Sequence, residues 1–400
     1  MYQITTYKSQ NKERILECIY RNPSISRTEI AELTGITPAT TTHTIAELIA
    51  DSLVYEEHLP EVSLPSTAGR KRIPLNIYAT SKYALGIEFN LKALTLCVTD
   101  LKGNIVYTEY TPYTDTMSTQ ITSFIIQKIR HTLDCCQIPE SNFLGIGLAI
   151  PGHIDADKHF MVSNNITWKG FDAKTISSAF SIPLVLENNV RCMALSSYLF
   201  HPEYVPDSFS YFHVGMGMFC ANILNGSLFQ GHTYVSGEIG HTIVNPTGLR
   251  CECGKQGCLQ TIASERWILK NVKQLYELDS FDILHRLVSS ADEITLKTIA
   301  AAYSLGDETL ISIVSNALKY LGISISNIAI LMNPEKIFLH GELFTYPSIH
   351  SELMNLIHQQ LTFIDNNYVQ SIEILPYAKE DGAIGGAALA IMKFLLKNPL

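Results

Sequence analysis

The 400-residue sequence has no run of about eighteen or more apolar residues, so we expect no membrane-spanning helix. Its first residues, MYQITTYKSQNKER, lack the basic and then apolar pattern of a signal peptide, and we therefore expect a cytoplasmic protein. Only 17% of the residues are charged and 46% are hydrophobic, a balance that fills folded cores and excludes a disordered chain. The net charge of −9 argues against nucleic-acid binding by overall charge and leaves room for a local basic patch.

The nine cysteines are an odd number and do not form the spacing of a disulfide framework. Three of them crowd into one short stretch, and the other six lie in mostly apolar surroundings. In a reducing compartment, such residues are expected to be core thiols rather than disulfides. The six are Cys18, Cys97, Cys135, Cys136, Cys192 and Cys220.

The most informative stretch is GHTIVNPTGLRCECGKQGCLQ, which contains His241, Cys251, Cys253 and Cys258. Three thiols and one imidazole are a suitable ligand set for tetrahedral Zn²⁺. Four protein ligands leave no open position for a catalytic water, so the sequence predicts a structural zinc that holds a loop. The alternative is a set of four unrelated buried residues.

The first fifty residues predict three helices. Apolar residues over 11–20 lie on one helical face, and a second helix begins after Ser26, which forms a capping box with Glu29. That helix ends at Gly35, and a third helix begins with Thr37 as its N-cap. Two helices joined by a tight glycine-containing turn, after a preceding helix, describe a helix-turn-helix.

The third helix is the candidate reader of DNA, because short polar groups in its first turns can reach phosphates and base edges. A wing is expected next, with two short strands around a loop that carries a dense cationic cluster suited to a narrow minor groove. The alternative for this cluster is a solvated linker. The candidate DNA-binding residues are Thr37, Thr40, Thr41, His43, Thr44, Arg70, Lys71 and Arg72.

From Tyr83 the pattern changes to three consecutive strands and then to alternating strands and helices, which predicts an α/β fold with a mixed sheet. A similar strand-rich opening recurs at SYFHVGMGMFCANILNGSLFQG, and the later part is mainly helical. Two such units in tandem indicate a duplicated body with a ligand cleft between its lobes. The expected domains are residues 1–78, residues 79–200 together with 380–400, and residues 201–379.

Several strings along the chain resemble the ROK family, which contains sugar kinases and sugar-responsive repressors. The zinc string is the most specific of them, and GIGLAIPGHID, LENNV, GEIGH and DGAIGGAALA support it together. The resemblance covers essentially all 400 residues, because the repressor branch adds a winged helix in front. It implies a winged helix-turn-helix followed by a two-lobed, actin/hexokinase-like (ribonuclease H-like) body.

The family's kinases bind phosphate through glycine-rich loops, and those loops are altered in this chain. Where the kinases have Asp-x-Gly-Gly-Thr, the sequence reads Glu88-Phe-Asn-Leu-Lys, so side chains block a close approach of the backbone. The second loop has Met216 and Phe219 in place of a hydroxyl and a glycine. In the later Gly-Gly pair, the first residue is His340.

The position of the kinases' general base holds Asn189, in an Asn-Asn pair where the family has Asn-Asp. A carboxamide has no accessible basic state and cannot take a proton from the sugar hydroxyl. Loss of a positioned base typically slows a reaction by about 10²–10⁴-fold. The resemblance therefore implies that this chain is not an enzyme.

Sugar binding can survive these changes, because carboxamides both donate and accept hydrogen bonds toward hydroxyls. By resemblance, sugar hydroxyls meet the first Asn of the pair, the Glu of GEIGH, the zinc-bound His and the residue after the last Cys, with Asn165 and Trp168 at the rim. For Glu238 the alternative is a loop-structuring role, and for Asn188 a turn role. The candidate sugar-binding residues are Asn165, Asn188, Asn189, Glu238, His241 and Gln260.

We therefore expect a transcriptional repressor of carbohydrate uptake or metabolism genes that binds operator DNA as a dimer or tetramer. A sugar or sugar phosphate in the cleft would change the spacing of the two DNA-binding heads. Three alternatives stay open at this point. The protein could be an active sugar kinase with an accessory DNA-binding domain, a regulator that has a vestigial cleft and is controlled by a protein partner, or an activator.

Overall fold

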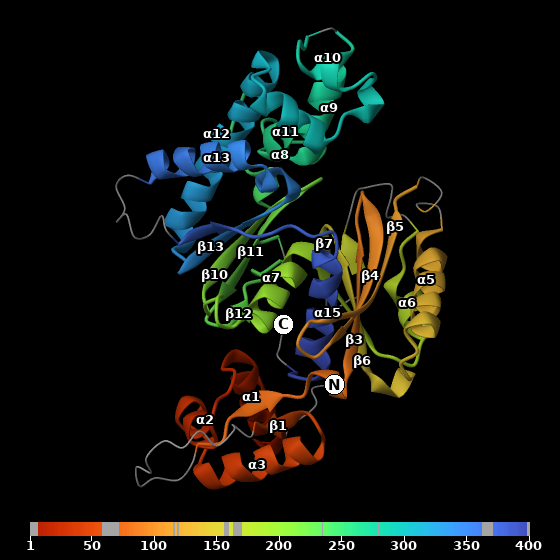
Figure 1. Ribbon diagram of the computed structural model, residues 1–400, viewed down its shortest axis with the longest axis vertical. Helices are drawn as coiled ribbons and strands as arrows, with labels where there is room; N and C mark the ends of the chain where they lie inside the picture. The colour runs from red at the N-terminus through yellow and green to blue at the C-terminus, as the bar shows by residue number, and fades with distance from the viewer. Residues whose placement is uncertain are drawn as a thin grey trace. The chain divides into compact units, whose positions relative to one another are not determined.

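The computed structural model places the chain in two compact units, residues 1–206 with 380–400 and residues 207–379. Figure 1 traces the chain through both units, and each is described by itself below. The residues that the structure describes are 7–57, 72–114, 117, 120–155, 160–162, 170–233, 235–278, 280–361 and 371–397.

The first unit begins with three helices, α1 (Tyr7–Arg21), α2 (Arg27–Thr34) and α3 (Pro38–Ala50). Each predicted cap is confirmed. Ser26 and Glu29 form a reciprocal capping box, Gly35 ends α2 with a φ of 67°, and Thr37 accepts a hydrogen bond from the Thr40 amide. The first helix starts at Tyr7, four residues before the predicted 11–20, because polar residues precede its apolar face.

Two short antiparallel strands follow, β1 (Val54–Glu56) and β2 (Leu75–Ile77), with Val54 opposite Ile77. They are the predicted strands of the wing. The core beneath them is formed by fully buried apolar residues of α1 and α3, including Ile15 and Ile45. Helices α1–α3 and this strand pair therefore form a winged helix-turn-helix (Figure 1).

The rest of the first unit is built on a five-stranded sheet in the order β5-β4-β3-β6-β9. Strands β3, β4 and β5 are antiparallel neighbours, whereas β6 and β9 run parallel to β3. Its strands are β3 (Tyr83–Phe89), β4 (Ala93–Asp100), β5 (Ile105–Pro112), β6 (Phe143–Ile150) and β9 (Leu184–Asn188). A hairpin is formed by β7 (His153–Asp155) and β8 (Phe160–Val162).

Helices cover both faces of this sheet (Figure 1). One face carries α5 (Ile121–Cys136) and α6 (Ala173–Ser178), and the other carries α7 (Asn189–Phe200) and α15 (Asp381–Phe394). Helix α15 packs very closely against β6. A Cβ added at Gly147 would lie only 1.8 Å from the carbonyl oxygen of Gly386. Glycines on both β6 and α15 therefore permit this close packing.

The second unit has a sheet in the order β12-β11-β10-β13-β14. Three antiparallel strands are again followed by two that run parallel to the first of them. Both sheets therefore have the same strand order and directions, which confirms the predicted duplication. The strands are β10 (Phe209–Val214), β11 (Met218–Leu224), β12 (Ser227–Leu228), β13 (Lys336–His340) and β14 (Ile372–Ile374).

The helices of the second unit gather over one face of its sheet (Figure 1). One of them, α13 (Pro347–Gln360), is absent from the sequence-based expectations. Its buried residues Ile349, Leu353 and Ile357 recur every fourth position, a helical spacing that would have revealed it. The others are α8 (Gln260–Ala263), α9 (Glu265–Tyr276), α10 (Leu284–Leu287), α11 (Leu296–Ser304) and α12 (Glu308–Met332).

Among the described residues, α12 is the one helix long and apolar enough to cross a membrane. In its most apolar window, 56% of the residues are buried inside the protein. Leu318, Leu321 and Ile325 have no exposed surface and belong to the hydrophobic core of the second unit. Such burial is the pattern of a core helix.

The six thiols expected in the core divide by environment. Cys97, Cys192 and Cys220 are buried, as predicted, and none of the six is in a disulfide. For Cys135 the prediction is wrong, because this thiol is exposed on the last turn of α5, where it lies 3.3 Å from Nδ1 of His131.

Candidate functional site

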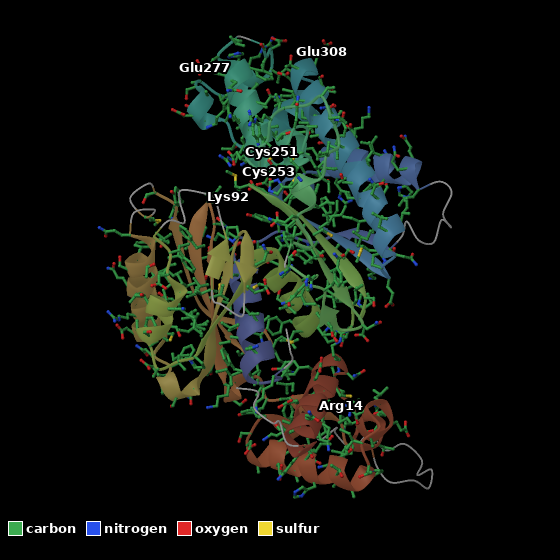
Figure 2. All side chains as sticks on the ribbon, turned by 180° about the vertical axis from the view of Figure 1, so that it is seen from behind. Arg14, Lys92, Cys251, Cys253, Glu277 and Glu308 are labelled. Carbon is green, nitrogen blue, oxygen red and sulfur yellow. The ribbon has the colours of Figure 1, made fainter. Side chains whose placement is uncertain are left out.

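The zinc string folds into a compact loop between β12 and α8 (Figure 2 labels Cys251 and Cys253 there). A short 3₁₀ turn over Ile239–His241 brings the imidazole to the loop. Gly257 makes the turn back, with a φ of 76° and an ideal Cβ position only 1.6 Å from the carbonyl oxygen of Asn245. No other residue fits there, so Gly257 is required for the turn that closes this loop.

The four predicted metal ligands converge. One ligand atom from each of His241, Cys251, Cys253 and Cys258 lies within 4.8 Å of the others. The Cys253 and Cys258 sulfurs are 3.6 Å apart, and Cys251 Sγ is 3.6 Å from His241 Nδ1. Tetrahedral Zn²⁺ with two thiolates requires a sulfur–sulfur separation of about 3.8 Å. This cluster could therefore hold a metal ion with little rearrangement.

Burial shapes the chemistry of the cluster. Cys251 and Cys258 are buried, whereas Cys253 is exposed. Burial raises the pKa of the Cys258 thiol to about 12, so this group is protonated at neutral pH without a cation. A divalent metal must displace that proton, which makes occupancy of such a site pH-dependent.

Two further side chains support the cluster. Gln260 donates a hydrogen bond from Nε2 to Cys251 Sγ at 3.2 Å, and Lys255 donates to the His241 carbonyl oxygen at 2.7 Å. An amide donor and a nearby ammonium both favour a thiolate-rich site. The candidate sugar ligand Gln260 therefore also contacts a thiol of the candidate metal cluster, a role that sequence spacing alone did not reveal.

The GEIGH segment carries Glu238 beside the cluster. Its Oε2 lies 3.9 Å from Nε2 of His241, and both side chains are partly exposed. The backbone amide of Cys220 in β11 donates a hydrogen bond to the Gly237 carbonyl oxygen at 2.8 Å and so attaches this segment to β11. Glu238, His241 and Gln260 are thus brought together in the second unit around the zinc loop.

Asn188 and Asn189 lie in the first unit, where β9 ends and α7 begins. Asn188 is the N-cap of α7, and its Oδ1 accepts from the amides of Val190 and Arg191 at 2.9 and 3.3 Å. Its Nδ2 donates to the Gly152 carbonyl oxygen at 3.2 Å. A capping role for this residue is therefore present in the structure.

Asn189 contacts Glu88, the residue that stands in the expected position of the kinases' first aspartate. Its Nδ2 donates to Oε1 of Glu88 at 2.9 Å, and both side chains are buried. The Glu88 carboxyl group fills the space beside Gly382 at the start of α15, where an added Cβ would lie 2.1 Å from Glu88 Cδ. The amide and the carboxylate therefore form one packed polar pair at the end of β3.

The first loop that binds phosphate in kinases is a tight hairpin turn here. Oδ1 of Asn90 accepts hydrogen bonds from the Lys92 and Ala93 amides at 2.8 and 3.1 Å. The Asn90 amide itself donates to the Ala93 carbonyl oxygen at 3.0 Å. These backbone amides have their hydrogen-bond partners within the turn and are not directed at a ligand.

In the second unit, the corresponding strand ends carry two imidazoles. Nδ1 of His340 lies 2.9 Å from Nδ1 of His213, and the rings stack with centroids 5.1 Å apart. His340 and Phe219 are buried, and Met216, in the turn between β10 and β11, is half-buried. Side chains thus occupy the positions that are glycine or hydroxyl in the kinases.

The exposure predicted for the third helix is partly wrong. Thr41 and Thr44 are buried and lie on the same stripe as Ile45 and Leu48, because residues three and four apart share a helical face. Thr41 Oγ1 donates to the Ile36 carbonyl oxygen within the turn. The exposed face of α3 consists of Pro38, Ala39, Thr42, His43, Ala46 and Ala50.

Thr42 is therefore a candidate contact that sequence reasoning missed, although the spacing of Ile45 and Leu48 could have revealed it. His43 is exposed, with Nε2 3.2 Å from a carboxylate oxygen of Glu47. Thr37 is exposed and Thr40 half-buried, and their hydroxyls lie 2.9 Å apart.

Arg72 lies against the start of α2. Its guanidinium donates from Nε and Nη2 to the Glu29 carboxylate at 3.2 and 2.9 Å, and about three fifths of the side chain stays exposed (62%). The backbone amide of Ser26 is the largest cause of a lowered pKa at Glu29, followed by the Ser26 side chain and Arg72. Arg70 and Lys71, like Asn165 and Trp168 of the sugar site, lie outside the described residues.

Comparison with known proteins identifies both parts of the chain. The profile of the ROK family matches residues 84–393, and that of a winged helix-turn-helix DNA-binding domain matches residues 8–55. The xylose repressor of Bacillus subtilis (strain 168) is 28% identical over 402 residues, covering 98% of this chain and 97% of the repressor. The transcriptional dual regulator NagC of Escherichia coli K12 is 27% identical and covers 84% of this chain and 81% of NagC.

Solved structures give the same assignment. A ROK family transcriptional regulator, described as a homologue of the E. coli MLC protein, superposes with a TM-score of 0.75 at 25% identity and covers 98% of both chains. A ROK glucokinase from Streptomyces griseus, solved with glucose and AMPPNP, has a TM-score of 0.63 at 22% identity. It covers 77% of this chain and 98% of the glucokinase, and it shares the fold of the body.

Proposed function

The chain belongs to the ROK family, and from that premise we propose that it is a DNA-binding transcriptional repressor of carbohydrate uptake or metabolism genes, with operator affinity controlled by a sugar or sugar phosphate. The observation that carries this function is the fusion of a winged helix-turn-helix to a ROK body, an arrangement found along the full length of a xylose repressor. A repressor acts on the chromosome, so we assign the protein to the cytoplasm.

The DNA contacts in this proposal come from the exposed face of α3 and from the wing. Thr42 and His43 are the polar side chains best exposed on that face, and Thr37 and Thr40 stand at its start. Arg70, Lys71 and Arg72 supply the cations for the backbone or the minor groove. Two such heads in a homo-oligomer would read half-sites about one helical turn apart.

The sugar ligands are proposed from both units. Asn188 and Asn189 contribute amides from the first unit, and Asn165 stands in the same unit. Glu238, His241 and Gln260 contribute from the second. Each of these groups can hydrogen-bond a hydroxyl, and the set carries less negative charge than one with two carboxylates in place of the amides.

The protein is proposed to bind sugar without phosphorylating it. Relatives that cover 98% of this chain are named xylose repressors, and Asn189 cannot act as a general base. The amide hydrogen bonds of the Asn90 turn and the burial of His340 argue against a nucleotide at either strand-end loop.

The metal in this proposal is a structural Zn²⁺ held by His241, Cys251, Cys253 and Cys258. The donor set is soft, and the separations match a closed tetrahedral site. When bound, the metal fixes the orientation of the imidazole and of the loop that carries Glu238. No step of sugar recognition requires an open metal position.

The test starts from duplexes selected by the full-length protein from a random pool. Fluorescence anisotropy at a stated salt concentration then measures operator affinity alone and with D-xylose, N-acetylglucosamine, glucose and their phosphates. We expect one of these to weaken operator binding by about 5–150-fold. A protein that selects no duplex, or whose affinity no sugar changes, would contradict the proposed function.

A further inference from the structure

The structure offers a direct link between the DNA-binding head and the helix that starts at the sugar site. Arg21, the last residue of α1, donates from Nη1 to the Tyr198 carbonyl oxygen at 2.6 Å and from Nη2 to the Val205 carbonyl oxygen at 2.8 Å. Its guanidinium also lies 4.0 Å from the centroid of the Tyr198 ring. One planar side chain therefore makes two hydrogen bonds and a stacking contact.

The Tyr198 carbonyl belongs to the last turn of α7, where helix carbonyls have no partner within the helix. A cation placed there also interacts favourably with the negative end of the helix dipole. Arg21 is thus a C-terminal cap of α7 that is supplied by another domain of the same unit.

Helix α7 can act as one rigid body. It has twelve residues, a length of about 18 Å, and ten of these residues are buried. Arg191 in its first turn pairs with the buried carboxylate of Glu187 at 3.2 Å. Displacing one end of so tightly packed a helix must therefore displace the other end.

The N-terminal end of α7 carries two of the candidate sugar ligands, Asn188 and Asn189. The amide of Asn188 is already engaged with Gly152, and that of Asn189 with Glu88. A sugar hydroxyl that takes over either amide competes with one of these hydrogen bonds. Ligand binding is thus coupled to the position of the helix start.

The rest of the contact between the winged helix-turn-helix (the head) and the sheet and helices of the first unit (the body) is less tightly packed than the Arg21 contact. A cavity of about 200 Å³ lies between α1 and the end of α15, and at its edge the exposed Lys397 lies 3.7 Å from the half-buried Glu13 carboxylate. Tyr20 makes a second firm contact, donating from its hydroxyl to the Leu101 carbonyl oxygen at 2.9 Å. Leu101 follows β4 and does not belong to α7.

From these contacts we propose that α7 transmits sugar binding to the DNA-binding head through Arg21, which is a positioning residue and contacts neither sugar nor DNA. This inference rests on the proposed function and names the route by which it operates. A ligand that shifts the start of α7 moves its C-terminal cap and with it the orientation of α1. Coupling of this kind is reciprocal, so operator DNA must weaken sugar binding by the same factor.

The test compares four variants of the full-length protein with the wild type. Arg21→Ala removes the cap, and Arg21→Lys keeps the charge but cannot reach both carbonyl oxygens and stack on Tyr198. Tyr20→Phe is the matched control, since it removes one hydrogen bond between the head and the body without touching α7. Arg14→Ala controls for loss of an arginine on α1, because Arg14 (labelled in Figure 2) donates to the Thr34 carbonyl oxygen within the head.

Calorimetry with D-xylose, N-acetylglucosamine, glucose and their phosphates first measures sugar affinity, and hydrogen exchange then follows residues 7–57 and 189–200 with and without the sugar that binds. In the wild type and both controls, we expect sugar to change exchange in both segments. In both Arg21 variants, we expect sugar affinity within about three-fold of wild type, an unchanged response of α7, and no response of the head.

A head that responds equally in the Arg21 variants would overturn the inference and leave the proposed function intact. Loss of sugar binding in these variants would also overturn it, because Arg21 would then support the sugar site itself. Failure of the wild type to bind any sugar would contradict the proposed function and the inference together.

Discussion

The Nδ2 amide of Asn189 donates a hydrogen bond to the Glu88 carboxylate across 2.9 Å, and neither side chain is exposed to bulk solvent. A kinase of this family would carry an ionised base at position 189. Here the Asn189 amide stabilises the neighbouring Glu88 carboxylate. The two residues that differ from the kinase pattern, Glu88 and Asn189, therefore depend on each other. This dependence makes the replacement difficult to reverse.

We predict that Asn189→Asp destabilises the protein instead of creating a kinase. Two buried carboxylates in contact cannot both ionise, so the folded variant must hold a proton that the unfolded chain releases. Stability then falls as pH rises above about 4.5, and the loss reaches about 3–5 kcal/mol at pH 8. Urea unfolding between pH 5 and pH 8 measures this slope.

The double variant Glu88→Gln/Asn189→Asp is the control, because it removes the repulsion while keeping the hydrogen-bonding shape. It should recover most of the lost stability at pH 8. Equal stability of Asn189→Asp and wild type at all pH values would show that the pair is not closely packed.

The metal cluster predicts one zinc ion per chain. Cys258→Ser should abolish stoichiometric zinc and lower the melting temperature, because metal binding to the folded state contributes to stability. Gln260→Ala should leave the four ligands and weaken zinc affinity by about 10–100-fold through loss of the hydrogen bond to Cys251. Elemental analysis after dialysis against graded chelator measures both.

Cys135→Ser is the matched control for zinc binding, since Cys135 is an exposed thiol outside the cluster. It should retain zinc and melt as the wild type does. Full zinc content in Cys258→Ser would contradict the predicted ligand set.

Substitutions of exposed and of buried residues in α3 should have different effects on operator affinity and on the stability of the head. Thr42→Ala or His43→Ala should weaken specific operator binding, by about 1–3 kcal/mol where the side chain reaches a base edge, and should leave head stability within about 0.5 kcal/mol. Thr41→Val should show the opposite pattern, because its hydroxyl is buried and bonds to the Ile36 carbonyl oxygen. Anisotropy and hydrogen exchange of α3 amides distinguish the two results.

The capping box of α2 predicts a pH-dependent contribution to head stability. The Ser26 amide holds the pKa of Glu29 below its usual value, so this stability is present above about pH 4.5 and is lost as pH falls through the lowered folded pKa. Ser26→Ala should cost about 1 kcal/mol in α2 opening, measured by hydrogen exchange. In Glu29→Gln the acid dependence should disappear, and its persistence there would assign it to another group.

Local rules predicted much of this structure. Ser26, Gly35 and Thr37 mark helix ends through side-chain and φ preferences that act over three or four residues. The metal cluster follows from ligand type and from glycines that permit its turn. The duplication follows from the repeated order of strands, which chain topology then converts into matching sheets.

Sequence reasoning failed where a residue's role depends on what the fold brings beside it. Thr41 and Thr44 are polar by composition, yet they complete the buried stripe with Ile45. Asn188 caps α7 and bonds Gly152, which lies 36 residues away in sequence. The contact between Arg21 and Tyr198 joins residues 177 positions apart, and no local pattern encodes it.

The central claim is that a kinase-like body serves as a sugar-operated switch and not as a catalyst. The most direct measurement incubates purified protein, labelled operator, ATP, Mg²⁺ and the effective sugar together, and follows operator release and sugar phosphorylation in one sample. The account predicts release of the operator while the sugar remains unphosphorylated. Retention of the operator, or phosphorylation at about 1 s⁻¹ or faster, would contradict it.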